Sequence, residues 1–551
     1  MSPALSKPLP MPTQSTDATA PQTRPPTMPD TAPADLPVHL ERPTLTKIVA
    51  TLGPASDSAE VMTKLVEAGV SVFRFNFSHG TLDEHTARLK TLRTVASTLR
   101  RPLAALGDLQ GPKIRVGTVP GAGIEIEAGH EVTLRLGLAE AIEERDPDTG
   151  VMRVVLPFEY EPLVREVLPG HRVLINDGAI RMLAIDKNLA RGELHCRVTT
   201  GGLVTSRKGI NLPDSDLTAP AITERDWECV EWAVEHGIDM LALSFVRNAG
   251  EVTELKERLA GMCPISPDES DDFLGSTIPV IAKIEKPQAV DNIEEIVEAA
   301  DAIMVARGDL GVEMELARVP IVQKQIIETC NRYGKPCIVA TQMLESMIEN
   351  ASPTRAETTD VSNAVLDGAG AVMLSAETAT GKHPALVVET MRRIARAAEE
   401  HLAALPQRAS APQRLREQRY RTAALAHGAW HIANDIGAEL VVCWSQHGGG
   451  ARYLSQNDFT IPIIAYTSSL KAARRMALLR GVTPIRTEPP ESGRLRDWNA
   501  MVDADLIARG WAVTGTPIAI LAGKPLGTPK VATSVAIHYI GHPTGYRSND
   551  G

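Results

Sequence analysis

The chain has 551 residues, of which 43% are hydrophobic and 23% charged, and its formal net charge is −11. This length predicts several domains, because a single hydrophobic core stops growing beyond roughly 250–300 residues. The acidic balance argues against a nucleic-acid partner, whose phosphates would repel it. We find no uninterrupted apolar run of the roughly 18 residues that a membrane span needs, so no membrane partner is expected.

The first part of the chain, residues 1–43, is rich in proline, serine, threonine and alanine. Such a segment buries too little apolar surface to offset the entropy lost on ordering, so we expect it to be disordered. The cysteines are scattered and form no Cys-x-x-Cys pair; they are Cys196, Cys229, Cys263, Cys330, Cys337 and Cys443. This usage is typical of a reducing cytoplasm and not of a disulfide framework or a zinc site.

From Thr46 onward, short apolar strands alternate with amphipathic stretches of helical length. Eight strands are predicted, at 47–52, 71–77, 102–108, 240–246, 279–285, 302–308, 337–343 and 371–377. Near-continuous apolar strands separated by helices indicate a parallel sheet covered on both faces. Eight such units favour a closed (β/α)8 TIM barrel. The alternative is an open doubly wound sheet, but no Gly-x-Gly-x-x-Gly follows the first strand.

The alternation is interrupted once, between Lys113 and about Leu212, where stretches such as GIEIEAGHEVTLRL predict an inserted antiparallel β-barrel domain. We therefore expect a catalytic barrel at 44–113 and 213–403, which approaches the ~250 residues typical of this fold. The inserted domain takes 114–212, and a C-terminal α/β domain takes 404–551. Strands of this last domain are predicted at 438–444, 461–467, 517–523 and 531–540.

Charged and hydroxyl side chains stand at the carboxyl ends of the barrel strands, where this fold places its chemistry. They are Asn76, Ser78, Asp108, Ser244, Lys283, Glu285, Arg307, Asp309, Thr341, Ser375 and Glu377. Singly, each has a structural explanation, since a serine or threonine there is commonly a helix cap and a Lys–Glu pair is commonly structural. Together they are harder to explain by stability, because clustered buried charge is costly unless a ligand or metal completes it.

Two of these carboxylates, Glu285 and Asp309, are hard oxygen ligands on adjacent strands, and no His or Cys joins them. Such a sparse site suits Mg²⁺ or Mn²⁺, with water and substrate oxygens in the remaining positions. Arg74, Lys283 and Arg307 would add the positive charge that a transferring phosphoryl group needs. The residues predict a metal-assisted reaction on a small phosphorylated carboxylate.

Between about residues 44 and 400 the chain resembles the pyruvate kinase family. The motifs include TKIVATLGPAS, GVSVFRFNFSHG, GDLQGPKIR, IAKIEKPQAVDNI, DAIMVARGDLGVE, ATQMLESM and MLSAETATGKHP, in the family's order. The resemblance implies phosphoryl transfer from phosphoenolpyruvate to ADP, giving pyruvate and ATP. It also implies a cytoplasmic homotetramer under allosteric control by a sugar-phosphate or nucleotide effector.

The resemblance also implies roles for single residues. Glu285 and Asp309 would hold the divalent ion, and Lys283 and Arg74 would contact the transferring phosphoryl group. Substrate-carboxylate contacts map to the backbone of Gly308 and Asp309 and to Thr341. Thr341 and Ser375 would relay the proton to the enolate. Nucleotide contacts map to Arg74, Asn76, Ser78, His79, Arg115 and Lys208. Since the inserted domain begins and ends beside Arg115 and Lys208, we expect it to close as a lid; the alternative is a rigid decoration.

One position differs among members of the family. Asn76, Ser78, Asp108 and the Leu109 carbonyl correspond to a K⁺ site, and members that need K⁺ carry a glutamate where this chain has Lys113. A lysine there resembles the members that work without K⁺, which implies that its ammonium replaces the ion. The alternative is a surface lysine paired with a neighbouring carboxylate.

The C-terminal part matches the family more weakly. Its candidate effector loops keep Ser445, Lys524, Thr528, Lys530, Thr533 and Ser534. Glycine N–H groups and lysines there could hold a phosphate, but the shortage of hydroxyls argues against fructose 1,6-bisphosphate. Two rival functions are a metal-dependent barrel lyase acting on pyruvate enolates and a non-catalytic protein. The lyase would not need Arg115 and Lys208, and the non-catalytic protein predicts losses among the site residues that are not seen.

Overall fold

The computed structural model describes residues 44–145, 152–263, 277–405, 412–417, 419–524, 526 and 532–542. The segment 1–43, for which disorder is expected, lies outside these ranges. So do the candidate effector residues Thr528 and Lys530 and the side chain of Lys524.

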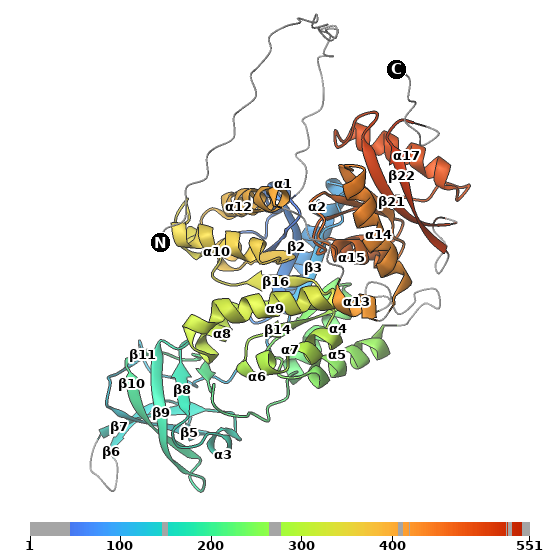
Figure 1. Ribbon diagram of the computed structural model, residues 1–551. Coiled ribbons are helices and arrows are strands. Elements are labelled where there is room, and N and C mark those ends of the chain that lie inside the picture. The colour runs from blue at the N-terminus through green and yellow to red at the C-terminus, as the bar shows by residue number, and fades with distance from the viewer. Residues whose placement is uncertain are drawn as a thin grey trace, which may run out of the picture. The chain divides into compact units, whose positions relative to one another are not determined.

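Eight parallel strands close into a barrel in the order β1-β17-β16-β15-β14-β13-β3-β2, which confirms the predicted fold (Figure 1). Their bounds are β1 (Lys47–Thr51), β2 (Val70–Asn76), β3 (Ala104–Asp108), β13 (Met240–Leu243), β14 (Val280–Ile284), β15 (Ala302–Ala306), β16 (Cys337–Ala340) and β17 (Ala371–Leu374). All eight lie at the predicted positions. Their residues are almost all buried, because helices cover the outer face and side chains fill the interior.

Helices follow the strands around the barrel. They are α1 (Ala59–Ala68), α2 (Leu82–Thr98), α4 (Glu224–Glu235), α5 (Ala249–Met262), α6 (Pro287–Asp291), α7 (Ile293–Ala299), α8 (Arg307–Glu313), α9 (Val319–Tyr333), α10 (Arg355–Leu366), α11 (Ala376–Ala379) and α12 (Pro384–Ala404), with 3-10 turns η1 (Leu316–Arg318) and η2 (Glu345–Ile348). Capping boxes led by Thr81, Thr223 and Thr354 begin α2, α4 and α10. Each box satisfies backbone N–H groups that the first helical turn leaves unpaired.

The inserted region forms between β3 and α4 and has its own hydrophobic cluster. Its elements are β4 (Ile124–Ile126), β5 (Glu131–Leu136), β6 (Ile142–Arg145), β7 (Met152–Phe158), α3 (Leu163–Glu166), β8 (Arg172–Ile175), β9 (Ile180–Asn188), β10 (Glu193–Thr200), β11 (Gly202–Val204) and β12 (Ile210–Asn211). The strands form a seven-stranded sheet, β12-β8-β9-β10-β5-β7-β6, and a separate pair, β11-β4.

This arrangement differs from the expected antiparallel β-barrel in two respects. The strands lie in two sheets and not in one closed barrel. One pair, β5 with β7, is parallel, while β6 pairs with the other edge of β7 in antiparallel orientation.

The two chain segments that join the inserted region to the barrel pair with each other. Arg115 and Gly209 form an antiparallel bridge. The Val116 N–H donates to the Lys208 carbonyl at 2.8 Å, and the Ile210 N–H donates to the Ile114 carbonyl at 2.8 Å. Both crossings are therefore held as one two-stranded connection.

The C-terminal region contains a five-stranded sheet ordered β20-β19-β18-β21-β22. Its elements are α13 (Gln413–Glu417), α14 (Arg421–Asp435), β18 (Leu440–Trp444), α15 (Gly449–Ser455), β19 (Ile463–Thr467), α16 (Leu470–Met476), β20 (Val482–Arg486), α17 (Leu495–Ala508), β21 (Pro517–Lys524) and β22 (Ala532–Tyr539). Four of these strands were predicted. The prediction missed β20, an edge strand in which only Val482 is buried and Pro484 interrupts the apolar pattern.

A segment of the C-terminal region closes the amino end of the barrel. Ala477 and Leu478 pack into the inner cluster with residues such as Met240 and Ala302, which begin their strands. Beside them, the Gly481 N–H donates to the Leu45 carbonyl at 2.7 Å.

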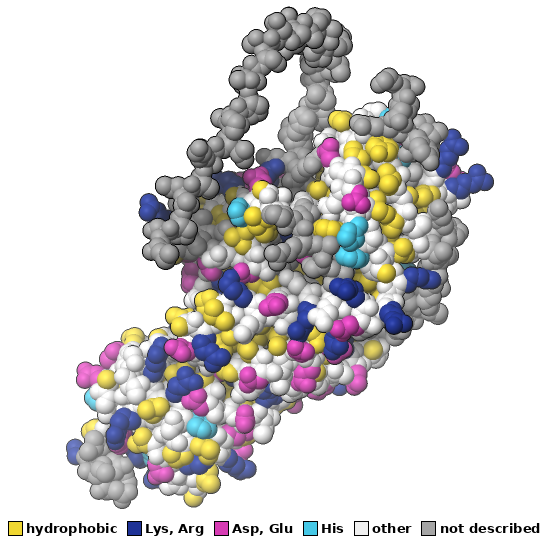
Figure 2. All heavy atoms as spheres, viewed as in Figure 1, with side chains coloured by type: hydrophobic (Ala, Val, Ile, Leu, Met, Phe, Trp, Pro, Cys, Tyr) yellow, Lys and Arg dark blue, Asp and Glu magenta, His cyan; other side chains and the backbone are white. Residues whose placement is uncertain are grey.

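Among the described residues, no helix is long and apolar enough to cross a membrane. On the face shown in Figure 2, acidic and basic side chains are interspersed over the coloured residues.

Candidate active site

Four charged side chains form a chain of alternating sign at the carboxyl ends of β2, β3 and β14. The Arg74 Nε donates to Asp108 Oδ2 at 2.6 Å. The Lys283 Nζ lies 3.1 Å from Asp108 Oδ1 and 3.0 Å from Glu285 Oε1. Asp108 and Glu285 are each 1% exposed and Lys283 is 8% exposed. Charges buried this deeply persist only when paired, and here two cations balance two carboxylates.

The pKa shifts of these groups follow from burial and pairing. Burial opposes the charged form of Lys283, but the carboxylates of Asp108 and Glu285 outweigh burial and raise its pKa. Burial likewise opposes the Asp108 carboxylate, yet Lys283 and Arg74 lower its pKa. For Glu285 burial prevails and raises the pKa; Asp309 acts in the same direction and Lys283 opposes it. A bound cation would offset this burial by stabilising the charged form of Glu285.

Two backbone segments fix this network. The Lys283 Nζ donates to Ser244 Oγ at 2.7 Å, and the Ser244 hydroxyl donates to the Leu109 carbonyl at 2.7 Å. The Phe245 N–H donates to Glu285 Oε2 at 2.7 Å. Phe245 has φ of +55°, a left-handed conformation that a bulky residue adopts only at a cost. In this conformation the Phe245 N–H points toward the Glu285 carboxylate.

The next two strand ends are joined through Thr341. Its hydroxyl accepts from the Gly308 N–H at 2.8 Å and donates to the Ala340 carbonyl at 2.6 Å. The Arg307 guanidinium donates to the Thr341 carbonyl at 2.8 Å. Thr341 and Gln342 both have positive φ, +68° and +54°. The surrounding contacts hold both residues in this costly conformation.

The last strand end presents Ser375. Its N–H donates to Glu377 Oε2 at 2.6 Å. Its Oγ is buried and has no hydrogen-bond partner among the described residues. Burial raises the pKa of Glu377, although backbone N–H groups donate to it and lower the pKa. Ser375 thus keeps a hydroxyl that is able to bind a water molecule or substrate oxygen.

The chain matches known proteins over most of its length. Residues 44–388 match the family described as pyruvate kinase, barrel domain, and residues 423–538 match pyruvate kinase, alpha/beta domain. This chain belongs to the pyruvate kinase family. It is 39% identical to pyruvate kinase of Mycobacterium tuberculosis over 497 residues, which cover 90% of this chain and 98% of that protein. Pyruvate kinases of Corynebacterium glutamicum and Methylorubrum extorquens are each 38% identical, over 91% of this chain and 98% of theirs.

The two carboxylates expected to hold a divalent ion, Glu285 and Asp309, would form a site with few protein ligands. Within the described ranges, no group of three or more His, Cys, Asp or Glu side chains is placed to hold a metal ion. Burial raises the pKa of Glu285, and the negative charge of Asp309 acts in the same direction. Two hard carboxylates fit Mg²⁺ or Mn²⁺, which keep several water molecules and bind substrate phosphate oxygens.

Of the residues assigned to nucleotide binding or to the K⁺ site, Asn76 and Ser78 share one turn, in which Asn76 Oδ1 accepts from the Ser78 N–H at 3.1 Å. The His79 N–H donates to the Asn76 carbonyl at 3.2 Å. The Phe77 N–H donates to the Asp108 carbonyl at 3.0 Å, so this turn sits against β3.

Lys113, Arg115 and Lys208 lie in the two chain segments that join the barrel to the inserted region. The Lys113 Nζ lies 3.7 Å from Asp177 Oδ1 of the inserted region. The Arg115 Nη1 donates to the Arg207 carbonyl at 3.1 Å. In this arrangement Asp108 is paired with Arg74 and Lys283, while Lys113 faces the inserted region.

In the C-terminal region, Ser445 is buried and its Oγ accepts from the Ala451 N–H at 3.1 Å, inside α15. Thr533 and Ser534 lie on β22, where the Ser534 hydroxyl lies 3.5 Å from the Ala522 carbonyl. Ser445 therefore has a structural role as well as any role toward an effector.

Sequence reasoning missed three residues beside the site: Asn211, Lys286 and Glu313. Two signals were available, because Lys286 directly follows Glu285 and Glu313 stands four residues after Asp309 on one helix. Asn211 offered none, since its partner Glu313 is 102 residues away in the chain.

Proposed function

We propose that this enzyme transfers the phosphoryl group of phosphoenolpyruvate to ADP, giving pyruvate and ATP. The observation that carries the proposal is the buried ammonium of Lys283, held between Asp108 and Glu285 at 3.1 and 3.0 Å. Its raised pKa keeps it charged at neutral pH. A fixed cation in a water-poor site stabilises charge that develops on a transferring phosphoryl group.

The other residues of the network position this charge. Asp108 orients both Arg74 and Lys283, so that two cations face the phosphoryl group from different strands. Glu285 and Asp309 would hold Mg²⁺ or Mn²⁺. When bound, that ion supplies Lewis-acid charge to phosphate and enolate oxygens. The backbone of Gly308 and Asp309, together with Thr341, would bind the substrate carboxylate. This requires the Gly308 N–H to release Thr341 Oγ1 and donate to the substrate.

We assign delivery of the proton to the enolate to Ser375 and Thr341, through water. The unpartnered Ser375 Oγ supports this assignment, because a buried hydroxyl without a partner is ready to hold a water molecule. Neither hydroxyl is acidic enough to act by itself, so each would pass on a proton and not supply it.

We further propose that the reaction runs without K⁺ and that Lys113 supplies the missing charge. Asp177, its present partner, has a side chain that is 68% exposed, and such a pair is weak. The Lys113 ammonium is therefore free to leave Asp177 and to bind the nucleotide phosphates when the lid moves. Arg115, Lys208, Asn76, Ser78 and His79 would complete the nucleotide site.

The family also supports a homotetramer with a phosphate-bearing effector in the C-terminal region, working in the cytoplasm. All six cysteines are free thiols, as a reducing compartment requires.

The test is steady-state pyruvate formation from phosphoenolpyruvate with Mg²⁺, with and without ADP, in K⁺-free buffer and then with KCl. We expect full activity without K⁺ and none without ADP. The variant Lys113→Glu should become dependent on K⁺, while Lys90→Glu, an exposed lysine on α2, should not. Activity of the wild type only with K⁺ would contradict the role of Lys113. Absence of pyruvate in either buffer would favour the lyase or the non-catalytic protein.

A further inference from the structure

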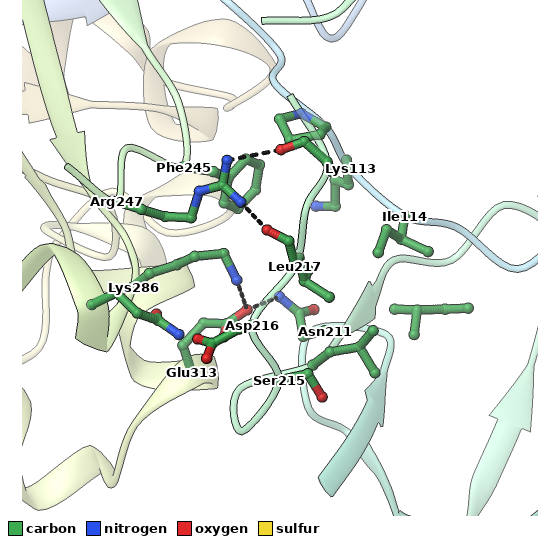
Figure 3. Close-up of a pocket in the computed structure, with 15 residues that line it drawn as sticks. Lys113, Ile114, Asn211, Ser215, Asp216, Leu217, Phe245, Arg247, Lys286 and Glu313 are labelled. Carbon is green, nitrogen blue, oxygen red and sulfur yellow. Dashed lines mark hydrogen bonds and ion pairs between the residues drawn. The ribbon is translucent and has the colours of Figure 1, made fainter. Parts of the chain in front are cut away.

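A buried carboxylate outside the chemistry described so far, Glu313, joins the lid to the helix that carries Asp309 (Figure 3). The Asn211 Nδ2 donates to Glu313 Oε1 at 2.9 Å, and the Lys286 Nζ lies 3.3 Å from the same oxygen. Glu313 is 1% exposed, and Asn211 and Lys286 are 9% exposed each. The three side chains therefore form one buried contact between separate parts of the chain.

Each partner comes from an element with a different role. Asn211 ends β12 of the lid, and Glu313 is the last residue of α8. Asp309 stands four residues before Glu313, so the two side chains share one face of α8. Lys286 directly follows Glu285 in the chain. The lid thus contacts α8, which carries Asp309, and is linked through Glu313 to Lys286, the residue that follows Glu285.

The aromatic ring of Phe245 extends this contact back to the site. The Lys286 Nζ lies 5.9 Å from the centre of the Phe245 ring, a cation–π distance. The Phe245 N–H is the group that donates to Glu285 Oε2. A movement of Lys286 would therefore affect Glu285 by two routes. One is the peptide bond that joins the two residues, and the other is the Phe245 ring and its N–H.

Beside Glu313 lies a cavity of about 90 Å³, which these residues line. Three oxygens in its wall are buried and have no hydrogen-bond partner among the described residues: Asn211 Oδ1, Gln288 Oε1 and Glu313 Oε2. A polar cavity of this size holds water. Water there lets Asn211 and Glu313 separate without leaving their polar atoms unpaired, so the contact is suited to being made and broken.

We propose that Glu313 is a positioning residue that couples the lid to the divalent-cation site. While Asn211 holds Glu313, α8 keeps Asp309 in the position that binds the ion; when the lid moves away, that hold is released. The inference rests on the proposed metal role of Glu285 and Asp309. Coupling of this kind is reciprocal, so cation binding must also favour the lid position seen here.

The experiment compares two variants with a matched control. Asn211→Ala removes the lid donor and keeps the Lys286–Glu313 pair, while Glu313→Gln removes the charge and keeps the shape. The control is Glu193→Gln, which also removes a 1% exposed carboxylate, paired with Arg135 at 2.7 Å inside the lid. For each full-length protein, Mn²⁺ binding to the free enzyme is measured by electron paramagnetic resonance, together with the thermal midpoint.

We expect Glu313→Gln and Asn211→Ala each to weaken Mn²⁺ binding about tenfold, as loss of groups that orient ligands does. Because Glu313→Gln weakens the acceptor of the contact that Asn211→Ala removes, the loss of Mn²⁺ affinity in the double variant should be smaller than the two single losses combined. Glu193→Gln should lower the thermal midpoint and leave Mn²⁺ binding unchanged.

The inference is overturned if Asn211→Ala and Glu313→Gln shift Mn²⁺ affinity no more than Glu193→Gln does. If Glu313→Gln fails to fold, Asn211→Ala decides alone. Asp309→Asn distinguishes failure of the metal assignment from failure of the coupling. If it binds Mn²⁺ as the wild type does, the metal assignment itself fails. If it loses binding while the other two variants keep it, only the coupling fails.

Discussion

The two ends of the barrel bury charge in opposite ways. At the carboxyl end, Lys283 is surrounded by carboxylates that raise its pKa. At the amino end, Lys47 is 7% exposed, and burial lowers its pKa to about 8 although Glu399 opposes the shift. The Glu399 carboxylate is engaged by the Leu45 and Thr46 N–H groups at 3.0 and 2.6 Å.

This contrast separates function from stability within one fold. The carboxyl end keeps its charges by pairing and tolerates strained residues at Phe245, Thr341 and Gln342. The amino end is filled by Ala477 and Leu478 from the C-terminal region. Substitutions at the carboxyl end should therefore change chemistry, and substitutions at the amino end should change stability.

The largest effect is expected for Glu285→Gln. The amide keeps the shape but removes the charge that would hold the divalent ion, so kcat/KM should fall at least about 10³-fold. Two opposing effects act on the thermal midpoint: the burial cost that raises the Glu285 pKa is removed, but Lys283 keeps only Asp108 as its partner. We therefore expect only a small change in the midpoint. Steady-state pyruvate formation measures the change in kcat/KM, and thermal unfolding measures the change in the midpoint. A parallel loss of activity and stability would contradict the separation of the two ends.

At the opposite end, Leu478→Ala should show the reverse behaviour. Leu478 is 1% exposed, so its truncation leaves a cavity and should destabilise the folded protein by about 2–5 kcal/mol. KM for phosphoenolpyruvate should change less than about twofold, because the barrel separates this residue from the carboxyl ends. A large KM change at unchanged thermal midpoint would show that the amino end also controls the chemistry.

A smaller effect is expected for Lys47→Met. The folded pKa of about 8 lies below the unfolded value near 10.4, so the unfolded chain binds more protons between these values. Burial of the charged Lys47 therefore lowers the free energy of unfolding by up to about 3 kcal/mol below pH 8, and this penalty disappears as pH rises toward 10. Lys47→Met should raise the thermal midpoint at pH 7 and have little effect at pH 10. An equal effect at both pH values would mean that charge burial is not its cause.

The same contrast explains what sequence could predict. The eight barrel strands were predictable because apolar runs flanked by helices indicate a parallel sheet. Asp108, Lys283 and Glu285 were found because strand ends meet at one edge of a barrel. The Asn211–Glu313 contact was not, since it joins residues 102 positions apart with no periodic signal. Nor were the positive φ values at Phe245 and Thr341, because tertiary contacts impose them against local preference.

The central claim is that the Lys283 ammonium, held by Asp108 and Glu285, neutralises the transferring phosphoryl group. The most direct measurement is kcat/KM for phosphoenolpyruvate in Lys283→Met, with Mn²⁺ binding followed on the same preparation. In Lys283→Met, kcat/KM should fall at least about 10³-fold while Mn²⁺ still binds. Activity within tenfold of the wild type in a protein that binds Mn²⁺ would contradict it.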